Sequence, residues 1–146
     1  MTQKESATFV HYGVRLIGVV YLALGVIGFV PIEALNPLHS EGIGAHYLLN
    51  LVAINWFHNL FHIAIGITAL WAARTLRGAQ VWGKIGGSVL LLLFVVGMAQ
   101  AALQGFPKDQ LLLRLVPLNS PGHILHLFTG GLALYLGLAH PAPGAS

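Results

Sequence analysis

Charged side chains are so sparse in this sequence that long apolar stretches run between them. Lys, Arg, Asp and Glu make up 8% of the 146 residues, against roughly 25% in soluble globular chains. A transmembrane helix needs about 20 consecutive apolar residues, and the chain has room for four such stretches. We therefore predict an integral membrane protein with spans at about 9–30, 50–73, 82–104 and 120–139.

The remaining basic residues predict how these spans are oriented. Lys4 and Arg15 flank the first span on its N-terminal side, and Arg74, Arg77 and Lys84 crowd the connection between the second and third spans. Lys and Arg are enriched in cytoplasmic loops. We therefore expect a multi-pass protein of the cell membrane with both termini cytoplasmic.

Local signals at the ends of the apolar stretches refine this prediction. The first stretch is longer than the apolar part of a cleavable signal peptide and is followed by no small-x-small cleavage site, so we expect it to remain as a span. Ser120 is a good N-cap, and Pro121 then falls at the first position of the fourth helix. A short interfacial piece is expected before the second helix, and residues 111–116 are apolar enough to lie along the membrane surface. The predicted fold is an all-α integral membrane four-helix bundle that forms a single domain over residues 1–146.

Several classes of function lack the residues that they need. The chain has no Cys, which excludes disulfides, thiolate metal sites and cysteine nucleophiles. Its seven Lys and Arg residues form no clustered basic face, so nucleic acid is not an expected partner. The predicted second and fourth spans contain no Asp or Glu, and no arrangement of Ser, His and an acid is visible. Nothing in the residues identifies an enzyme, and a non-enzymatic role is favoured.

An internal repeat is centred on Asn and His. Residues 55–70 (NWFHNLFHIAIGITAL), shifted by 64 positions, fall on residues 119–134 (NSPGHILHLFTGGLAL). The shared polar and small residues are Asn55 with Asn119, His62 with His126, and Gly66 with Gly130. Each copy contains an even number of spans, so a pseudo-twofold axis along the membrane normal is expected to relate them. The bundle is thus predicted to consist of two repeated transmembrane hairpins.

These motifs resemble those of a bacterial family of small four-span membrane proteins known only as a domain of unknown function. The shared features are the Asn and His spacing at the starts of the second and fourth spans, and a first span that contains Arg15, Gly18, Gly25, Gly28 and Phe29. The chain departs from the family pattern at Trp56 and Phe57, where smaller or turn-forming residues are expected. The resemblance covers most of the chain and implies a fold and a topology, but no activity.

Four histidines of the repeat are candidate metal ligands. His58 and His62 are four residues apart, and His123 and His126 are three apart, spacings at which a helix presents two imidazoles on one face. Both pairs are expected to face the bundle interior, because polar groups exposed to lipid are costly. Without Cys or a buried carboxylate, a site made of imidazoles alone suits Zn or Cu. The Asn side chains expected around these ligands are Asn55, Asn59 and Asn119.

A b-type haem is the alternative cofactor. His62 and His126 would be its axial ligands, and Gly66 and Gly130, one turn deeper, would leave room for a porphyrin face. Two axial ligands do not require the second His that each copy carries. A single metal ion uses all four histidines and is therefore ranked ahead of haem.

Other functional classes remain open beside a bound cofactor. The main rival is a non-catalytic membrane scaffold or interaction subunit, in which Asn and His only hold the helices together by hydrogen bonds worth about 1 kcal/mol each. A proton or small-solute pathway is weakened by the lack of polar residues in the cytoplasmic halves of the second and fourth spans. The lipid bilayer is the one definite partner, while a homo-oligomer or a membrane partner is left open.

Overall fold

The fold is described by a computed structural model over residues 3–30, 44–105, 110–112 and 114–139. It is mostly helical, with four long helices and two short antiparallel strand pairs in that part of the chain. The elements are, in chain order, α1 (Gln3–Ile27), β1 (His46–Leu48), β2 (Val52–Ile54), α2 (Trp56–Ala72), α3 (Leu76–Gln104), β3 (Gln110–Leu112), β4 (Val116–Leu118) and α4 (Ser120–Leu138).

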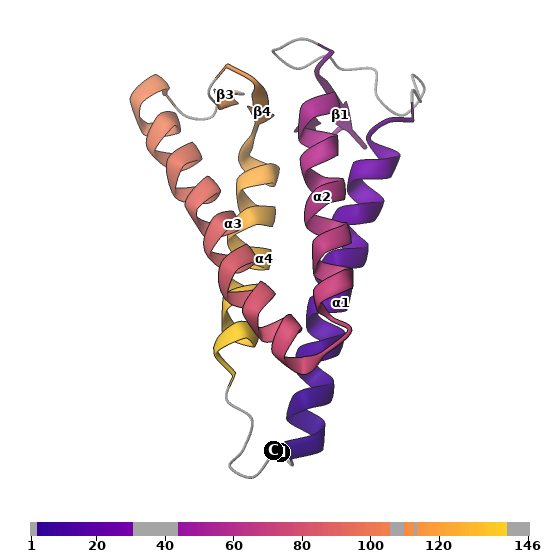
Figure 1. Ribbon diagram of the computed structural model, residues 1–146. Helices are drawn as coiled ribbons and strands as arrows, with labels where there is room; N and C mark the ends of the chain where they lie inside the picture. The colour runs from indigo at the N-terminus through magenta and orange to yellow at the C-terminus, as the bar shows by residue number, and fades with distance from the viewer. Residues whose placement is uncertain (1–2, 31–43, 106–109, 113, 140–146) are drawn as a thin grey trace.

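The helices pack as two pairs. α1 lies against α2 and α3 lies against α4 along most of their lengths, while the contacts between the two pairs are far fewer. α1 begins and α4 ends at the same end of the bundle as the α2–α3 connection, and both strand pairs lie at the opposite end (Figure 1). We call these the terminal end and the hairpin end.

The helical part of the prediction is confirmed. Two helices, α1 over Ala7–Ile27 and α3 over Leu76–Gln104, are long and apolar enough to cross a membrane. α2 and α4 are shorter, at 17 and 19 residues.

All four helix starts differ from the prediction by one to six residues. α1 begins at Gln3 rather than near residue 9. α2 begins at Trp56 rather than near residue 50, because the preceding residues form a strand. α3 begins at Leu76 rather than near residue 82, because Thr75 caps it and the charged connection is already helical. The cap of α4 is Asn119 and not Ser120, which is instead the first helical residue.

The two strand pairs were missed by a prediction of helices alone. β1 pairs with β2 so that His46 lies opposite Ile54, and β3 pairs with β4 so that Gln110 lies opposite Leu118. Each residue of the second pairing follows its counterpart in the first by 64 positions. Asn50 and Arg114, also 64 apart, both have left-handed backbones in the connecting turns, with φ of 57° and 62°.

The two ends of the bundle have different cores. At the terminal end the buried residues are small or aliphatic, including Ala69, Ala73, Ala79 and Ala133 beside Val10 and Val14. Toward the hairpin end a group of buried polar side chains lies among apolar ones such as Ile54 and Leu118. Its members are Asn55, His58, Asn59, His62, Asn119, His123 and His126.

Candidate metal centre

Asn55 and Asn119 begin the two helices that carry the histidines. The Asn55 side-chain oxygen accepts a hydrogen bond from the His58 backbone N–H at 2.9 Å, and the Asn119 oxygen accepts one from the Gly122 N–H at 3.2 Å. Both residues are in extended backbone conformations, as N-caps require. The caps fix where α2 and α4 start and therefore which side chains face inward.

The amide nitrogens of the same two residues join the two halves of the molecule. Asn55 Nδ2 donates to the Leu115 carbonyl, and Asn119 Nδ2 donates to the Leu51 carbonyl, both at 2.7 Å. Leu51 and Leu115 lie in the turns of the two strand pairs, so each Asn holds the turn of the other half. These bonds account for both amides without a cofactor.

Three histidines converge beside these caps. One nitrogen from each of His58, His62 and His126 lies within 4.8 Å of the others, and the residues are 2%, 1% and 3% exposed. The ring centroids of His58 and His62 are 4.3 Å apart, and that of His126 lies 6.1 and 6.3 Å from them. In the described part of the chain, this is the group of His, Asp and Glu side chains that could hold a metal ion.

Most of the ring nitrogens in this group have no hydrogen bond. His58 Nδ1, both nitrogens of His62 and His126 Nδ1 are buried without a partner among the described residues. A buried polar group without a partner costs about 1–3 kcal/mol. The other nitrogen of His58 faces the backbone carbonyls of Ala53 and Pro117, which suits the arrangement of metal-binding histidines, where the second N–H is held by a carbonyl.

Tyr21 is a neighbour of the site that the sequence did not reveal. Its ring meets the His62 ring edge-on, with centroids 5.0 Å apart, and the residue is fully buried. The Thr129 hydroxyl donates to the Leu125 carbonyl at 2.6 Å, so the Tyr21 hydroxyl, 2.8 Å from Thr129, is the donor of that bond. A single polar aromatic residue within an apolar stretch was the only available signal.

His123 is not part of this group. Its ring packs against α3, close to Gly97 and with its centroid 6.4 Å from that of Phe94. The residue 64 positions earlier is Asn59, whose side chain likewise packs against a glycine of its own half, Gly28, which directly follows α1. Both positions therefore face the partner helix within a pair, so the prediction of His123 as a fourth ligand finds no support in the geometry.

Helix geometry explains why the two pairs of histidines do not present their side chains in the same way. At about 100° per residue, a residue four positions before His62 lies about 40° to one side of it. A residue three positions before His126 lies about 60° to the other side. His58 and His123 therefore occupy different faces, and the counterpart of His58 in the second copy is Gly122.

Gly66 and Gly130 do not border an open space. A Cβ on Gly66 would lie 2.6 Å from the Leu22 backbone nitrogen of α1, and one on Gly130 would lie 3.0 Å from Leu90 and Leu91 of α3. The glycines allow the helices of each pair to approach closely. The room expected for a porphyrin face is occupied there by α1 and α3.

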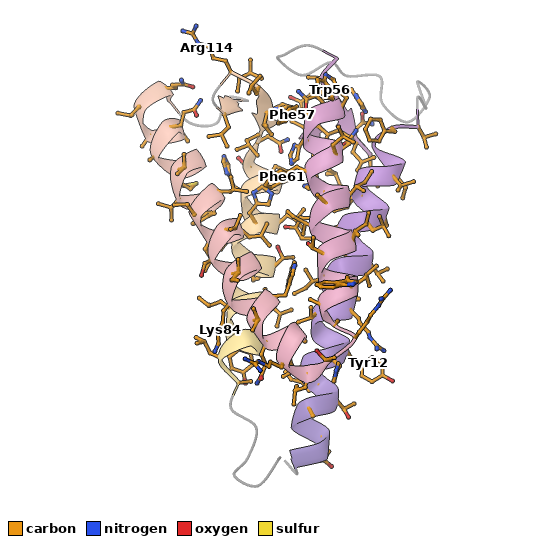
Figure 2. The ribbon with its side chains drawn as sticks, in the orientation of Figure 1. Tyr12, Trp56, Phe57, Phe61, Lys84 and Arg114 are labelled. Carbon is orange, nitrogen blue, oxygen red and sulfur yellow. The ribbon has the colours of Figure 1, made fainter. Side chains whose placement is uncertain are left out.

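A cavity of about 180 Å³ adjoins the three histidines. His58 and His126 line it, and its other walls are apolar side chains from α2, α3 and the β3–β4 pair. Phe57 and Phe61, near the start of α2 (Figure 2), form one wall and are each about 40% exposed. The histidine group is thus open on one side to an apolar space.

The residues present fit a transition metal. Zn–N distances to His are about 2.0–2.1 Å, which places tetrahedral ligand atoms about 3.3 Å apart, so modest ring rotations would close a set already within 4.8 Å. Three neutral imidazoles leave one coordination position free, as in catalytic zinc sites. No Asp, Glu or Cys joins the group within the described residues, which favours Zn or Cu over harder ions.

Fold and site together define a mostly helical protein with a buried group of three histidines. Residues 11–139 match the family model named Domain of unknown function (DUF4383), and the chain belongs to this family. The resemblance seen in the sequence is therefore confirmed. No curated protein and no solved structure matches the chain.

Proposed function

We propose that this protein is a metal-binding integral membrane protein that holds Zn or Cu at His58, His62 and His126. The observation that carries the proposal is the set of four buried ring nitrogens in these residues that lack hydrogen-bond partners among the described residues. A single metal ion accepts lone pairs from several of them at once. Among the described residues, these nitrogens have no hydrogen-bond partner that could take the place of the metal.

The outer surface of the bundle supports insertion in a membrane. Large apolar side chains are exposed on all four helices, among them Leu16, Trp71, Leu92 and Phe128 at 61%, 67%, 61% and 71%. Soluble monomers rarely expose contiguous apolar surface of this extent. α2, with 17 residues, is about 26 Å long at 1.5 Å per residue, close to the hydrocarbon thickness of about 30 Å.

The charges support the proposed orientation, with both termini on the cytoplasmic side. Arg74, Arg77 and Lys84 belong to the terminal end, where Lys84 is seen in Figure 2. Arg114 lies at the hairpin end in the same view. The excess of basic residues at the terminal end is the pattern of a cytoplasmic face and supports a position of the histidine group nearer the outer face.

The repeated-hairpin architecture is supported by the recurrence of one offset. Strand registers, left-handed turn residues, N-caps and the carbonyls that receive Asn55 and Asn119 all recur 64 positions apart. Such agreement between independent backbone features is expected when two copies share one local structure.

A metal ion is favoured over b-type haem by the packing around the site. Gly66 and Gly130 lie against α1 and α3 rather than beside a planar gap. His58, which a haem with two axial histidines does not need, lies within the ligand group.

The scaffold alternative has one observation in its favour. Asn55 and Asn119 join the two halves reciprocally and need no cofactor for that role. A scaffold accounts for the asparagines, whereas it leaves four ring nitrogens of the three histidines without partners among the described residues.

The test is elemental analysis and visible spectroscopy of the protein purified in detergent after expression with metal and haem precursors supplied. We expect close to one Zn or Cu per chain and no Soret band. A Soret band would favour the haem alternative. Neither stoichiometric metal nor haem would leave the scaffold as the better reading.

A further inference from the structure

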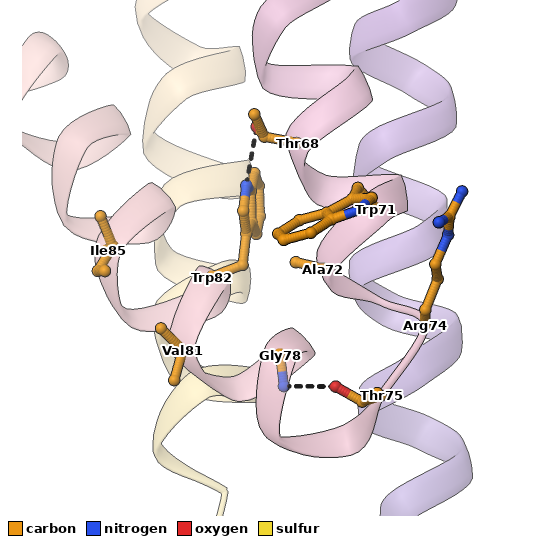
Figure 3. A pocket seen from close by; sticks show the side chains of 9 residues that line it. All are labelled: Thr68, Trp71, Ala72, Arg74, Thr75, Gly78, Val81, Trp82 and Ile85. Carbon is orange, nitrogen blue, oxygen red and sulfur yellow. Dashed lines mark hydrogen bonds between the residues drawn. The ribbon is translucent and has the colours of Figure 1, made fainter.

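A second cavity lies between α2 and α3 at the terminal end, and no histidine among the described residues lines it. Its volume is about 510 Å³. Figure 3 shows Trp71 and Trp82 side by side in its wall, with Arg74 at one edge and Val81 and Ile85 at the other. The metal site makes no use of this cavity.

Three of the polar groups in its wall make local hydrogen bonds. The Trp82 indole N–H donates to the Thr68 hydroxyl at 3.1 Å, and that hydroxyl donates in turn to the Ala64 carbonyl at 2.8 Å. The Thr75 hydroxyl oxygen accepts from the Gly78 backbone N–H at 3.0 Å as the cap of α3. The surface that the cavity offers to a bound molecule is therefore mainly apolar and aromatic.

Arg74 is the charged residue of the cavity lining. The residue is exposed, and its guanidinium has no hydrogen bond or ion pair with another described residue. Its guanidinium can bind a phosphate through two parallel hydrogen bonds. The cavity thus combines one free cation at its edge with an apolar interior.

The apolar surface continues toward the middle of the bundle. A neighbouring cavity of about 270 Å³ shares Thr68, Trp82 and Ile85 with the first and extends to Val89. From Gly78 to Val89 the groove follows α3 for about 17 Å at 1.5 Å per residue. One leaflet of the hydrocarbon core is about 15 Å thick, so the groove has the length of an acyl chain in one leaflet.

We propose that this groove binds one phospholipid with an anionic headgroup from the cytoplasmic leaflet. Arg74 would hold the headgroup phosphate, and an acyl chain would lie along Trp71, Trp82 and Ile85. The proposal rests on the membrane placement given above and not on the metal. Trp at the level of the headgroups and anionic lipid in the cytoplasmic leaflet both agree with it.

The tryptophans of the groove provide the measurement. The chain has three Trp, so Trp56→Phe leaves Trp71 and Trp82 as reporters. This variant is reconstituted in phosphatidylcholine vesicles that contain a small fraction of phosphatidylglycerol or phosphatidylcholine with brominated acyl chains, which quench nearby Trp fluorescence. We expect the brominated phosphatidylglycerol to be about fivefold more effective at low fraction, because one Arg contributes that preference near an anionic lipid.

Matched charge variants separate a site from general attraction to the surface. Arg74→Gln should remove the preference. Arg77→Gln, which removes the same charge from the same connection but does not line the groove, should keep it. Equal quenching by both lipids, or a preference that survives Arg74→Gln, would overturn the lipid site while leaving the membrane placement intact. Absence of quenching by either lipid would overturn both, and the metal content measured on the same samples would still report on the histidine site.

Discussion

The starts of α2 and α4 agree in their caps and differ in the residues that follow. Both begin with Asn, and both carry His seven residues later, at His62 and His126. Three residues after the cap, α2 has His58 where α4 has Gly122. The caps and their crossed hydrogen bonds build a nearly symmetric frame, and the site inside it is asymmetric.

This difference sets the number of imidazoles at the centre. A strictly repeated sequence would bring either two or four histidines to the shared face. Because the second copy has Gly122 at the position of His58, three histidines remain. Three ligands keep one coordination position free on a tetrahedral metal. The fourth histidine of the repeat, His123, occupies the position equivalent to Asn59 and packs against α3.

Removing His62 should have the largest effect on this arrangement. Loss of a supporting group around a metal ligand already lowers metal affinity about 10–100-fold, so we expect His62→Ala to lower it by at least about 100-fold. Competition with a chelator of known affinity, followed by elemental analysis, measures the change.

His123→Ala is the matched control. It removes an imidazole of similar burial from α4, yet it should leave the metal affinity unchanged. Equal losses in His62→Ala and His123→Ala would show that all four histidines act together and that the geometry described here is not the metal-bound one.

The sequence was sufficient for the helices and for most of the site. The four apolar stretches and the spacing N-x6-H-x3-G were local signals, and the histidines at its centre do come together. The local spacing matches His123 with His58 as the second His of each copy, whereas the offset of 64 pairs His123 with Asn59. His123 as a fourth ligand stays a prediction. A shift of one residue turns a side chain by about 100° on a helix.

Other features depend on contacts that no local pattern contains. A short apolar run is ambiguous between helix and strand, and residues 52–54 and 116–118 are such runs. The carbonyls of Leu51 and Leu115 accept hydrogen bonds from side chains of the other half of the chain, 68 and 60 residues away. Asn50 favours a left-handed turn and was the one sequence signal for a β-hairpin. Arg114, at the equivalent position of the second copy, gives no such signal.

The symmetric part of the comparison predicts equal effects in the two halves. Asn55→Ala and Asn119→Ala each remove an N-cap worth about 1 kcal/mol and a hydrogen bond worth about 1 kcal/mol. We expect each variant to lose about 2 kcal/mol of unfolding free energy, measured by denaturation in detergent. Asp at either position keeps the cap acceptor but not the amide donor, and should lose about half as much. A much larger loss in one half would contradict the reciprocal arrangement.

Restoring the missing symmetry should strengthen the metal site. A Cβ on Gly122 would meet Asn119 Oδ1 at 3.5 Å, an ordinary contact, so a side chain is tolerated there. Gly122→His places an imidazole at the equivalent of His58, and we expect a gain in metal affinity of about tenfold, or about 1.4 kcal/mol. Gly122→Ala is the control and should bind as the parent does. If the His variant also binds as the parent does, positions 58 and 122 do not face the same centre.

The smallest expected effect concerns a second asymmetry, between α1 and α3. Tyr21 is buried against His62, whereas the residue 64 positions later, Ile85, is 64% exposed. Tyr21→Phe keeps the ring contact and removes the hydroxyl that donates to Thr129, so we expect a loss of about 0.6 kcal/mol of unfolding free energy, the average for hydrogen bonds between membrane helices. Metal affinity should stay at the parent value, because the ring that shapes the His62 environment remains. Thr129→Val removes the acceptor of that bond together with the hydroxyl that donates to Leu125. Adding Tyr21→Phe to Thr129→Val should therefore cost little more, since the bond between them is already broken. A fall in metal affinity in Tyr21→Phe alone would instead assign the hydroxyl to the metal site.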